Sequence, residues 1–275
     1  MSLPVSAGVL DEDTYVNERT IAPTIDSLNE NVLSENVLSE NVINENANSI
    51  TLVGEDEWYP YAALKDGKLQ GLAVDIIEAA FAAVKVKVQF KSAPYARCLM
   101  LAESGQELAC FDSLKDGKLN KKFLFHTEPI FSAEIGIYAL SNSGEKNVQL
   151  STLRGKQVGV THGYTYTDKV DTDNWIIREV APTDLSNLRK LLRQRSAYSL
   201  VYTRVVDHLL TRYPDEFRGK IKQVGSLSQS ALFVSFSKQR AESVKFAELL
   251  DEGLRKIKKN GEYAKIEQKW QHPLP

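Results

Sequence analysis

In the body of the chain, short apolar runs with the period of a β-strand alternate with amphipathic segments that have the period of a helix. The runs 50–53, 86–90 and 108–111 are separated by helix-like segments at 72–84 and 95–103. Apolar residues recur at helical spacing in 72–84, whereas 86–90 alternates between apolar and polar residues. Strands that follow one another through helices make right-handed crossovers, so this order predicts a parallel sheet covered by helices.

The same alternation restarts after a break near residue 130. The expected strands of this part are 135–140, 157–160, 198–202 and 230–235, and the expected helices are 184–193, 204–212 and 241–259. A second α/β unit with a late return segment predicts two lobes. Ligands of open α/β sheets bind beyond the carboxyl ends of the strands, and clefts between domains are preferred sites. We therefore expect the functional site between the two lobes.

Composition and charge exclude several classes of protein. The 275 residues are 43% hydrophobic and 25% charged, as in ordinary globular proteins. No apolar run approaches the roughly 18 residues of a membrane helix, so we expect no membrane-spanning segment. The first 50 residues carry nine acids and one base, which leaves 33 basic and 27 acidic residues and a net charge of +6 in the remainder. That charge is too small to predict a nucleic-acid partner.

Residues 1–49 form an acidic leader with a repeated pentad, Glu-Asn-Val-Leu-Ser. A period of five matches neither 3.6 nor 2, so no single face collects the apolar residues. We interpret the leader as a low-complexity, disordered tether, with a docking segment as the alternative. Met1–Pro4 has neither the basic start nor the apolar core of a secretory signal. The protein is therefore either cytoplasmic or has lost its signal peptide.

Motifs of the common enzyme classes are missing from the sequence. It contains no GxSxG, no P-loop and no GxGxxG, and no paired CxxC or HxxxH for zinc. We therefore predict no enzyme activity, no catalytic residue, no cofactor and no metal site. Cys98 and Cys110 are interpreted as two small buried side chains. A disulfide in an oxidising compartment is the alternative.

Four segments, in this order along the chain, are similar to motifs of bacterial extracellular solute-binding proteins of family 3. They are Val53–Tyr61, Asp66–Ile76, Thr127–Ile130 and Leu153–Val160. The family comprises amino-acid-type receptors of ABC importers with the type II periplasmic binding protein fold. The resemblance covers about residues 50–270.

This resemblance implies an α/β fold of two lobes, each a mainly parallel sheet flanked by helices and joined by two crossovers. Lobe 1 would comprise residues 50–139 plus 230–275, and lobe 2 residues 140–229. The crossovers would form a hinge near Leu140-Ser141 and Gln229-Ser230. Proteins of this kind close on the ligand by hinge motion.

The resemblance also implies ligand contacts in lobe 1. Trp58 and Tyr95 match positions where aromatic rings enclose the ligand, exclude water and attract cations. Asp56 and Glu57, which the sequence does not distinguish, lie near a position that binds a basic ligand group. A further pair, Asp112 and Ser113, follows the strand 108–111 and would offer main-chain and hydroxyl contacts. Packing or solvated roles are the alternatives for all six.

In lobe 2, the loop 161–165 would open a helix and hold a ligand carboxylate at its free N–H groups. Thr165 matches the hydroxyl donor, with Tyr164 as the alternative register. The family's carboxylate-binding Arg and ammonium-binding Asp are not matched, because Asn120 and Thr203 stand at those positions.

We hypothesise that Arg97 or Arg204 replaces the missing arginine and meets an anionic group of the ligand. Both Thr203 and Arg204 are therefore included among the candidate ligand-binding residues. A surface helix residue is the alternative for either arginine.

These observations predict a monomeric periplasmic protein that captures a small polar solute, an amino acid or a related charged metabolite, between its lobes. It would present that solute to a membrane permease of an ABC-type importer or to a sensor. One alternative is an enzyme of the same fold, such as a cyclohexadienyl-dehydratase-like lyase. Another is a sensory or partner-binding module without the usual ligand.

Overall fold

A computed structural model describes residues 49–271, which belong to one compact unit. The predicted acidic tether and its pentad repeat lie outside the described residues, apart from Ser49. Within the described part of the chain, no helix has the length and apolarity required to cross a membrane.

The strands form a nine-stranded sheet in the order β10-β9-β11-β8-β12-β6-β1-β5, with β7 beside β12. They are β1 (Ser49–Gly54), β5 (Lys87–Ser92), β6 (Ala109–Leu114), β7 (Phe123–Phe125), β8 (Phe131–Leu140), β9 (Gln157–Thr161), β10 (Ile177–Ala181), β11 (Tyr198–Tyr202) and β12 (Ile221–Ser237). A small antiparallel sheet is formed by β2 (Glu57–Trp58), β3 (Ala62–Lys65) and β4 (Lys68–Gln70).

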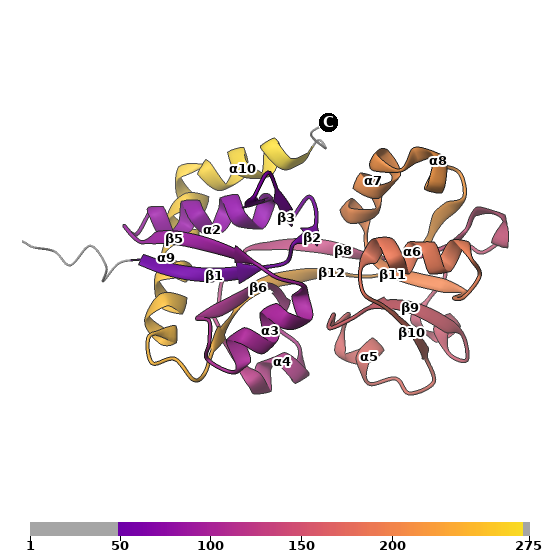
Figure 1. Cartoon of the computed structure of the whole chain (residues 1–275), viewed down its shortest axis with the longest axis horizontal. Helices are drawn as coiled ribbons and strands as arrows, with labels where there is room; N and C mark the ends of the chain where they lie inside the picture. Colours follow the sequence, from indigo (N-terminus) through magenta and orange to yellow (C-terminus); the bar gives the residue numbers. More distant parts are fainter. Residues whose placement is uncertain (1–48, 272–275) are drawn as a thin grey trace, which may run out of the picture. The chain divides into compact units, whose positions relative to one another are not determined.

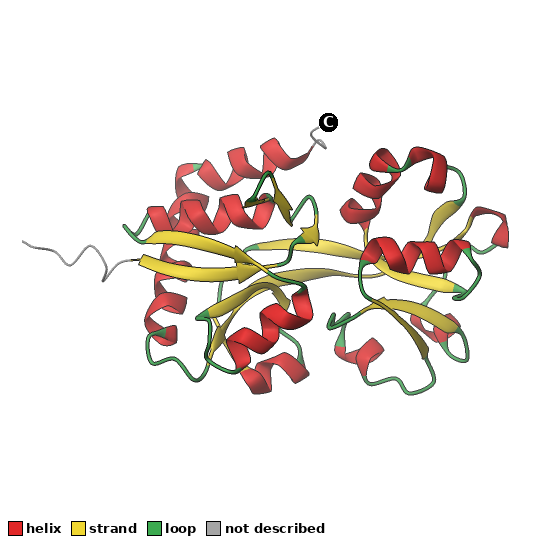
Figure 2. Ribbon diagram, viewed as in Figure 1, coloured by secondary structure: helices red, strands yellow, loops and turns green. Residues whose placement is uncertain are grey.

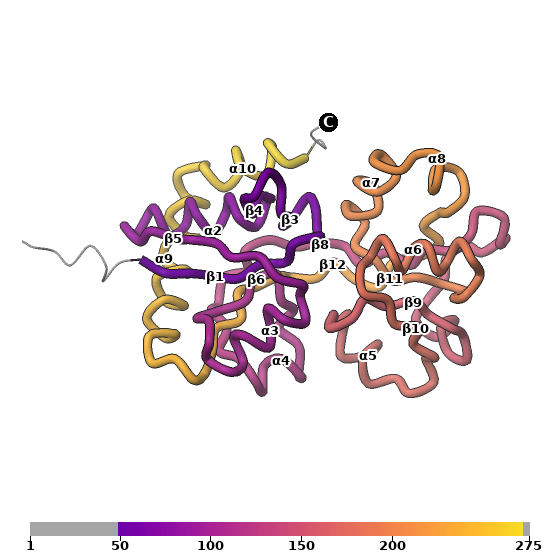
Figure 3. The backbone as a smooth tube through the Cα atoms, in the orientation of Figure 1, coloured from indigo at the N-terminus to yellow at the C-terminus, as the bar shows by residue number. Residues whose placement is uncertain are grey.

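Two groups of parallel strands are joined through two long antiparallel strands (Figure 1). In the first group, β1 pairs in parallel with β5 and β6, and in the second β9 pairs in parallel with β10 and β11. The predicted parallel pairing is thus confirmed in both groups. The connecting strands β8 and β12 pair with each other along nearly all of β8 (Figure 2). The described part of the chain, residues 49–271, begins and ends beside the first group (Figure 3).

Helices flank both groups of strands (Figure 2). In the first group they are α2 (Leu72–Ala82), α3 (Tyr95–Glu103), α4 (Gly117–Lys122), α9 (Ser243–Asn260) and α10 (Glu262–Gln271). In the second they are α5 (Asp168–Asp171), α6 (Asp184–Leu192), α7 (Thr203–Arg212) and α8 (Pro214–Phe217), with short 3₁₀ turns at Ser141–Ser143 and Leu150–Leu153.

The amphipathic helices bury the apolar faces that the sequence predicted. Ile76, Ile77 and Phe81 of α2 are fully buried. Helix α9 crosses α2 at Gly253, where an added Cβ would lie 2.0 Å from the carbonyl oxygen of Ala80. Only glycine allows the two helix backbones to approach this closely.

Three expectations from the sequence are wrong. Strand β12 has 17 residues rather than the six of 230–235. The sequence pattern did not reveal its first half, because that half is rich in serine and glutamine, which are not typical strand residues. Asp112 and Ser113 lie inside β6 rather than in a loop after it. Cys98 and Cys110 form a disulfide, which replaces their interpretation as two unlinked side chains.

A fourth difference concerns the loop 161–165. The helix that this loop was expected to open begins only at Asp168 and is four residues long, with Thr167 as its N-cap. So short a helix cannot supply the N-terminal carboxylate site that was expected at Thr165.

Candidate functional site

Five of the eleven predicted ligand-binding residues line one cavity, which we call the central cavity. Its lining comprises Glu55, Trp58, Tyr95, Asp112, Leu114, Tyr164, Thr165 and Tyr202. The first five residues lie in the part of the chain that contains the first group of strands, and the last three lie in the part that contains the second. The central cavity therefore lies between the two groups, at the ends of β1, β6, β9 and β11.

One contact across the central cavity joins the two groups directly. The Tyr164 hydroxyl lies 2.7 Å from both carboxylate oxygens of Glu55, to which it donates. Glu55 is 7% exposed, and this burial raises the pKa of its carboxyl well above the usual range. Burial likewise raises the pKa of Tyr164, so its hydroxyl remains a donor at neutral pH.

Asp112 is the second acidic side chain of the central cavity. Its residue is 6% exposed, and neither carboxylate oxygen has a hydrogen-bond partner among the described residues. Burial raises the pKa of this carboxyl well above its usual range. The backbone of Asp112 has φ 68°, a left-handed conformation inside a strand. Residues with strained backbone of this kind cluster at functional sites.

Aromatic rings enclose the two carboxyl groups. The ring of Trp58 lies edge-on to Tyr202 and Tyr164, with centroids 4.8 Å and 6.5 Å away, and Tyr95 lies 5.2 Å from Tyr164. The indole Nε1 of Trp58 and the hydroxyl of Thr165 are buried without a partner among the described residues. Unsatisfied polar atoms inside an aromatic wall are typical of a binding site rather than of a core.

Hydrogen bonds behind the cavity hold Tyr95 in place. Its hydroxyl donates to Ser113 Oγ at 3.0 Å, and Ser113 is hydrogen-bonded in turn to Ser235 at 2.9 Å. Ser113 is thus a supporting residue and does not line the cavity. The Cys98–Cys110 disulfide links α3, which carries Tyr95, to β6, which carries Asp112.

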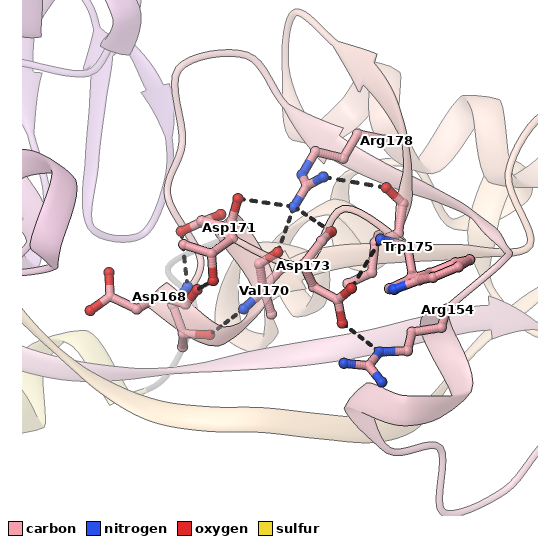
Figure 4. Close-up of polar contacts among 10 residues, drawn as sticks. Arg154, Asp168, Val170, Asp171, Asp173, Trp175 and Arg178 are labelled. Atoms are coloured by element: carbon pink, nitrogen blue, oxygen red, sulfur yellow. Dashed lines mark hydrogen bonds and ion pairs between the residues drawn. The ribbon is translucent and has the colours of Figure 1, made fainter.

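Polar contacts also fix the loop that carries Tyr164 and Thr165. The carboxylate of Asp171 accepts from the amide of Tyr166 at 2.9 Å. Just beyond, the Arg178 guanidinium donates to backbone carbonyls of the segment 170–176, and Arg154 forms an ion pair with Asp173 at 2.7 Å (Figure 4). Asp171 therefore anchors the end of the loop at Tyr166, next to Thr165.

The central cavity is small in this conformation. Its volume is about 10 Å³, which is room for about one water molecule. A further contact closes the two groups on each other, since the amide of Gly117 donates to Asp168 at 2.9 Å. A solute of several atoms therefore requires the two groups to separate.

Asp56 and Glu57 line a different space, which we call the outer cavity. It has a volume of about 330 Å³ and lies between the small sheet β2–β4 and helices α6 and α7. The structure therefore does not bring these two acids to the central cavity.

The remaining predicted residues also lie away from the central cavity. Arg97 is exposed on α3. Arg204 donates to the backbone carbonyl of Trp270 and lies over the ring of Tyr61, with 5.5 Å from the guanidinium carbon to the ring centroid. Thr203 is the first residue of α7, beside Arg204. Among the described residues that line the central cavity, none is basic.

Three residues of the central cavity were not predicted: Glu55, Leu114 and Tyr202. Glu55 directly follows β1 and Tyr202 ends β11, so the rule that ligands bind at strand ends could have identified both. Leu114 ends β6, a strand that the sequence analysis ended three residues too early.

Comparison with known proteins identifies related folds. Residues 50–273 match the family profile described as bacterial extracellular solute-binding proteins, family 3. An ancestral arginine-binding protein bound to arginine has 23% identity and a TM-score of 0.68, covering 82% of this chain and 99% of its own. The arginine-, lysine-, histidine-binding protein ArtJ from Geobacillus stearothermophilus has 19% identity and a TM-score of 0.68, with coverage of 82% and 96%.

A histidine kinase sensor domain with similarity to periplasmic binding proteins is also similar. It has 17% identity and a TM-score of 0.70, and the alignment covers 81% of this chain and 96% of that domain. No curated protein matches the chain in sequence. The family and the two arginine-binding structures are binding proteins rather than enzymes.

Proposed function

The chain belongs to family 3 of the bacterial extracellular solute-binding proteins, and from this premise we propose that it captures a small organic cation in the central cavity. The observation that carries the proposal is the buried carboxylate of Asp112, which has no partner among the described residues. A buried carboxylate without a partner is costly, and it is stabilised either by a proton or by a cation. An ammonium or guanidinium group would supply that partner.

The surroundings of Asp112 favour the same class of ligand. Glu55 adds a second carboxyl group, and the rings of Trp58, Tyr95 and Tyr202 offer cation–π contacts. The carboxylate of an α-amino acid would have no basic partner in this cavity. We therefore favour cations without a carboxylate, such as amines and guanidines, over α-amino acids.

Binding would proceed by opening and closing of the two lobes. The predicted lobes, residues 50–139 plus 230–275 and residues 140–229, stay a proposal, as does the hinge. Strands β8 and β12 are the natural place for it, because they connect the two groups of strands. A ligand held by residues of both groups would shift the equilibrium toward the closed form.

The disulfide supports an extracytoplasmic location. Disulfides persist in oxidising compartments such as the periplasm and are rare in the cytoplasm. We propose that the protein acts in the periplasm and presents its solute to a membrane permease or to a sensor.

Titration of the purified protein with putrescine, agmatine, arginine and glutamate tests this function by calorimetry. We expect putrescine or agmatine to bind and Asp112→Asn to weaken that binding at least tenfold. Asp215→Asn, the same change on the exposed surface of α8, is the matched control. Binding of glutamate without binding of either amine would overturn the proposed ligand class.

A second candidate function is a module that binds a protein partner and no solute. The volume of the central cavity, room for about one water, favours it, and the similarity to a sensor domain shows that the fold occurs in that setting. Failure of all four compounds to bind, together with an unchanged radius of gyration in their presence, would support this candidate.

A further inference from the structure

The outer cavity has the volume of a ligand site in the conformation described. Its approximately 330 Å³ lies at the lower end of the range for small-molecule pockets. One wall is the segment 56–64 of the small sheet, and the other comprises the start of α6 and one side of α7. It therefore lies between the two groups of strands, separate from the central cavity.

Asp184, at the start of α6, provides the strongest polar feature of the outer cavity. The residue is 3% exposed, and its Oδ1 accepts a hydrogen bond from the Thr161 hydroxyl. Its Oδ2 is buried and has no partner among the described residues. A buried carboxylate oxygen without a donor is unusual, because nearly all such atoms in folded proteins are satisfied. Asp184 lines the outer cavity, and a donor from a ligand there would satisfy Oδ2 once the carboxylate turns toward the cavity.

The charge of the cavity is predominantly acidic. Asp56 and Glu57 add two carboxyl groups to that of Asp184, whereas Arg212 is the one arginine of the lining. The Arg212 guanidinium lies 5.5 Å from the centroid of the Tyr213 ring, so it already has a contact within the protein. Burial lowers the pKa of His208, which keeps its imidazole neutral near pH 7. The cavity therefore favours a cation over an anion.

Apolar side chains line the wall that α6 and α7 form. Leu185 of α6 and Val205 and Leu209 of α7 line it, and Leu64 on the facing sheet is 50% exposed beside them. An apolar group bound here would shield these side chains from water. Each Å² of apolar surface that is buried stabilises the bound state by roughly 25 cal/mol.

We propose that the outer cavity is a second binding site, which takes a primary amine that carries an apolar group. The Asp184 carboxylate turns toward the cavity on binding, the ammonium group donates to its Oδ2, and the apolar group lies against Val205 and Leu209. The inference does not depend on the proposed function of the central cavity, because the two cavities share no lining residue.

Phenethylamine is the probe for this site, and phenylacetate, which has the opposite charge, is its matched control. The full chain with Asp112→Asn serves as the background, so that any cation site in the central cavity is weakened. We expect phenethylamine to bind this background with a stoichiometry of one and phenylacetate to bind at least tenfold more weakly. Stronger binding of phenylacetate would overturn the proposal, because the anchor would then be a basic group such as Arg212.

Two further variants in the same background assign the site. We expect Asp184→Asn to weaken phenethylamine binding at least tenfold, and Leu209→Phe, which fills the cavity without removing a charge, to do the same. Asp215→Asn is the surface control. Thermal melts check folding, and the two variants test the site independently if one of them fails to fold. Unchanged affinity in both folded variants would overturn the proposal, whatever the result at Asp112.

Discussion

The Tyr164 hydroxyl donates to both carboxylate oxygens of Glu55, across a sequence separation of 109 residues. Glu55 follows β1 in the first group of strands and Tyr164 follows β9 in the second, so this contact spans the central cavity. It holds the two groups together at the place where we propose that a ligand binds. Opening of the protein must therefore break it.

Tyr164→Phe removes that hydrogen bond while the ring is kept. Removing one partner of a buried hydrogen bond costs about 1–3 kcal/mol, because Glu55 is left buried without its donor. We expect the free energy of unfolding to fall by about that amount and the radius of gyration in solution scattering to rise. Tyr213→Phe, at a tyrosine that contacts arginine side chains by its ring, is the control. Equal effects of the two variants would contradict this role of Tyr164.

Gly163 provides a steric test of the same closure. It has φ +82°, and an added Cβ would lie 2.8 Å from the Cβ of Ala96 on α3, across the boundary between the groups. Gly219 has a similar φ of +74°, but no described residue lies within 4 Å of its added Cβ. Backbone strain alone costs about 1–2 kcal/mol for alanine in this conformation.

We therefore expect Gly219→Ala to lower stability by the strain cost only. Gly163→Ala should carry the same cost and in addition separate the two groups, which solution scattering would detect as a larger radius of gyration. An unchanged radius in Gly163→Ala would show that the loop yields without opening the protein.

Asp184 predicts a dependence of stability on pH. Burial raises the pKa of its carboxyl to about 7, from an unfolded value near 4. Because the folded-state pKa is raised, the protonated form is the one that folding favours. The resulting stability is fully present below about pH 4 and is lost as the pH rises through about 7.

Asp184→Asn removes this titration, so we expect a flatter dependence of stability on pH between about 4 and 7. Urea denaturation at pH 5 and pH 8 gives the free energy of unfolding at each pH. The fall in this free energy from pH 5 to pH 8 should be smaller in the variant than in the wild type, by on the order of a few kcal/mol. The same fall in stability with rising pH in variant and wild type would show that other buried carboxyl groups, such as those of Glu55 and Asp112, cause it.

The Cys98–Cys110 disulfide closes a short loop around α3 and the start of β6. In the chain-entropy treatment, a loop of this length stabilises the folded state by about 3 kcal/mol. We expect reduction by dithiothreitol to lower the melting temperature by several degrees and to weaken ligand binding, because Tyr95 and Asp112 lie on the two linked elements. The double variant Cys98→Ser, Cys110→Ser should melt at the same temperature with and without reductant. A reductant effect that persists in the double variant would exclude the disulfide as its cause.

The sequence by itself determined the order and type of most elements and their parallel pairing, because strand and helix periods are local properties. It predicted α3 over 95–103 and β11 over 198–202 with the bounds that the structure has. It also predicted Trp58 and Asp112 as candidate site residues, and both line the central cavity. Motif spacing was sufficient to assign the family.

Only the tertiary structure decided which polar side chains share a cavity. Asp56 and Glu57 are neighbours of Glu55 in sequence, yet they face the outer cavity while Glu55 faces the central one. Arg97 has the charge to bind an anion but lies exposed on its helix. The sequence also left open whether Cys98 and Cys110 pair. Each of these outcomes depends on contacts between segments distant in the chain, and on the direction of individual side chains, neither of which a local pattern specifies.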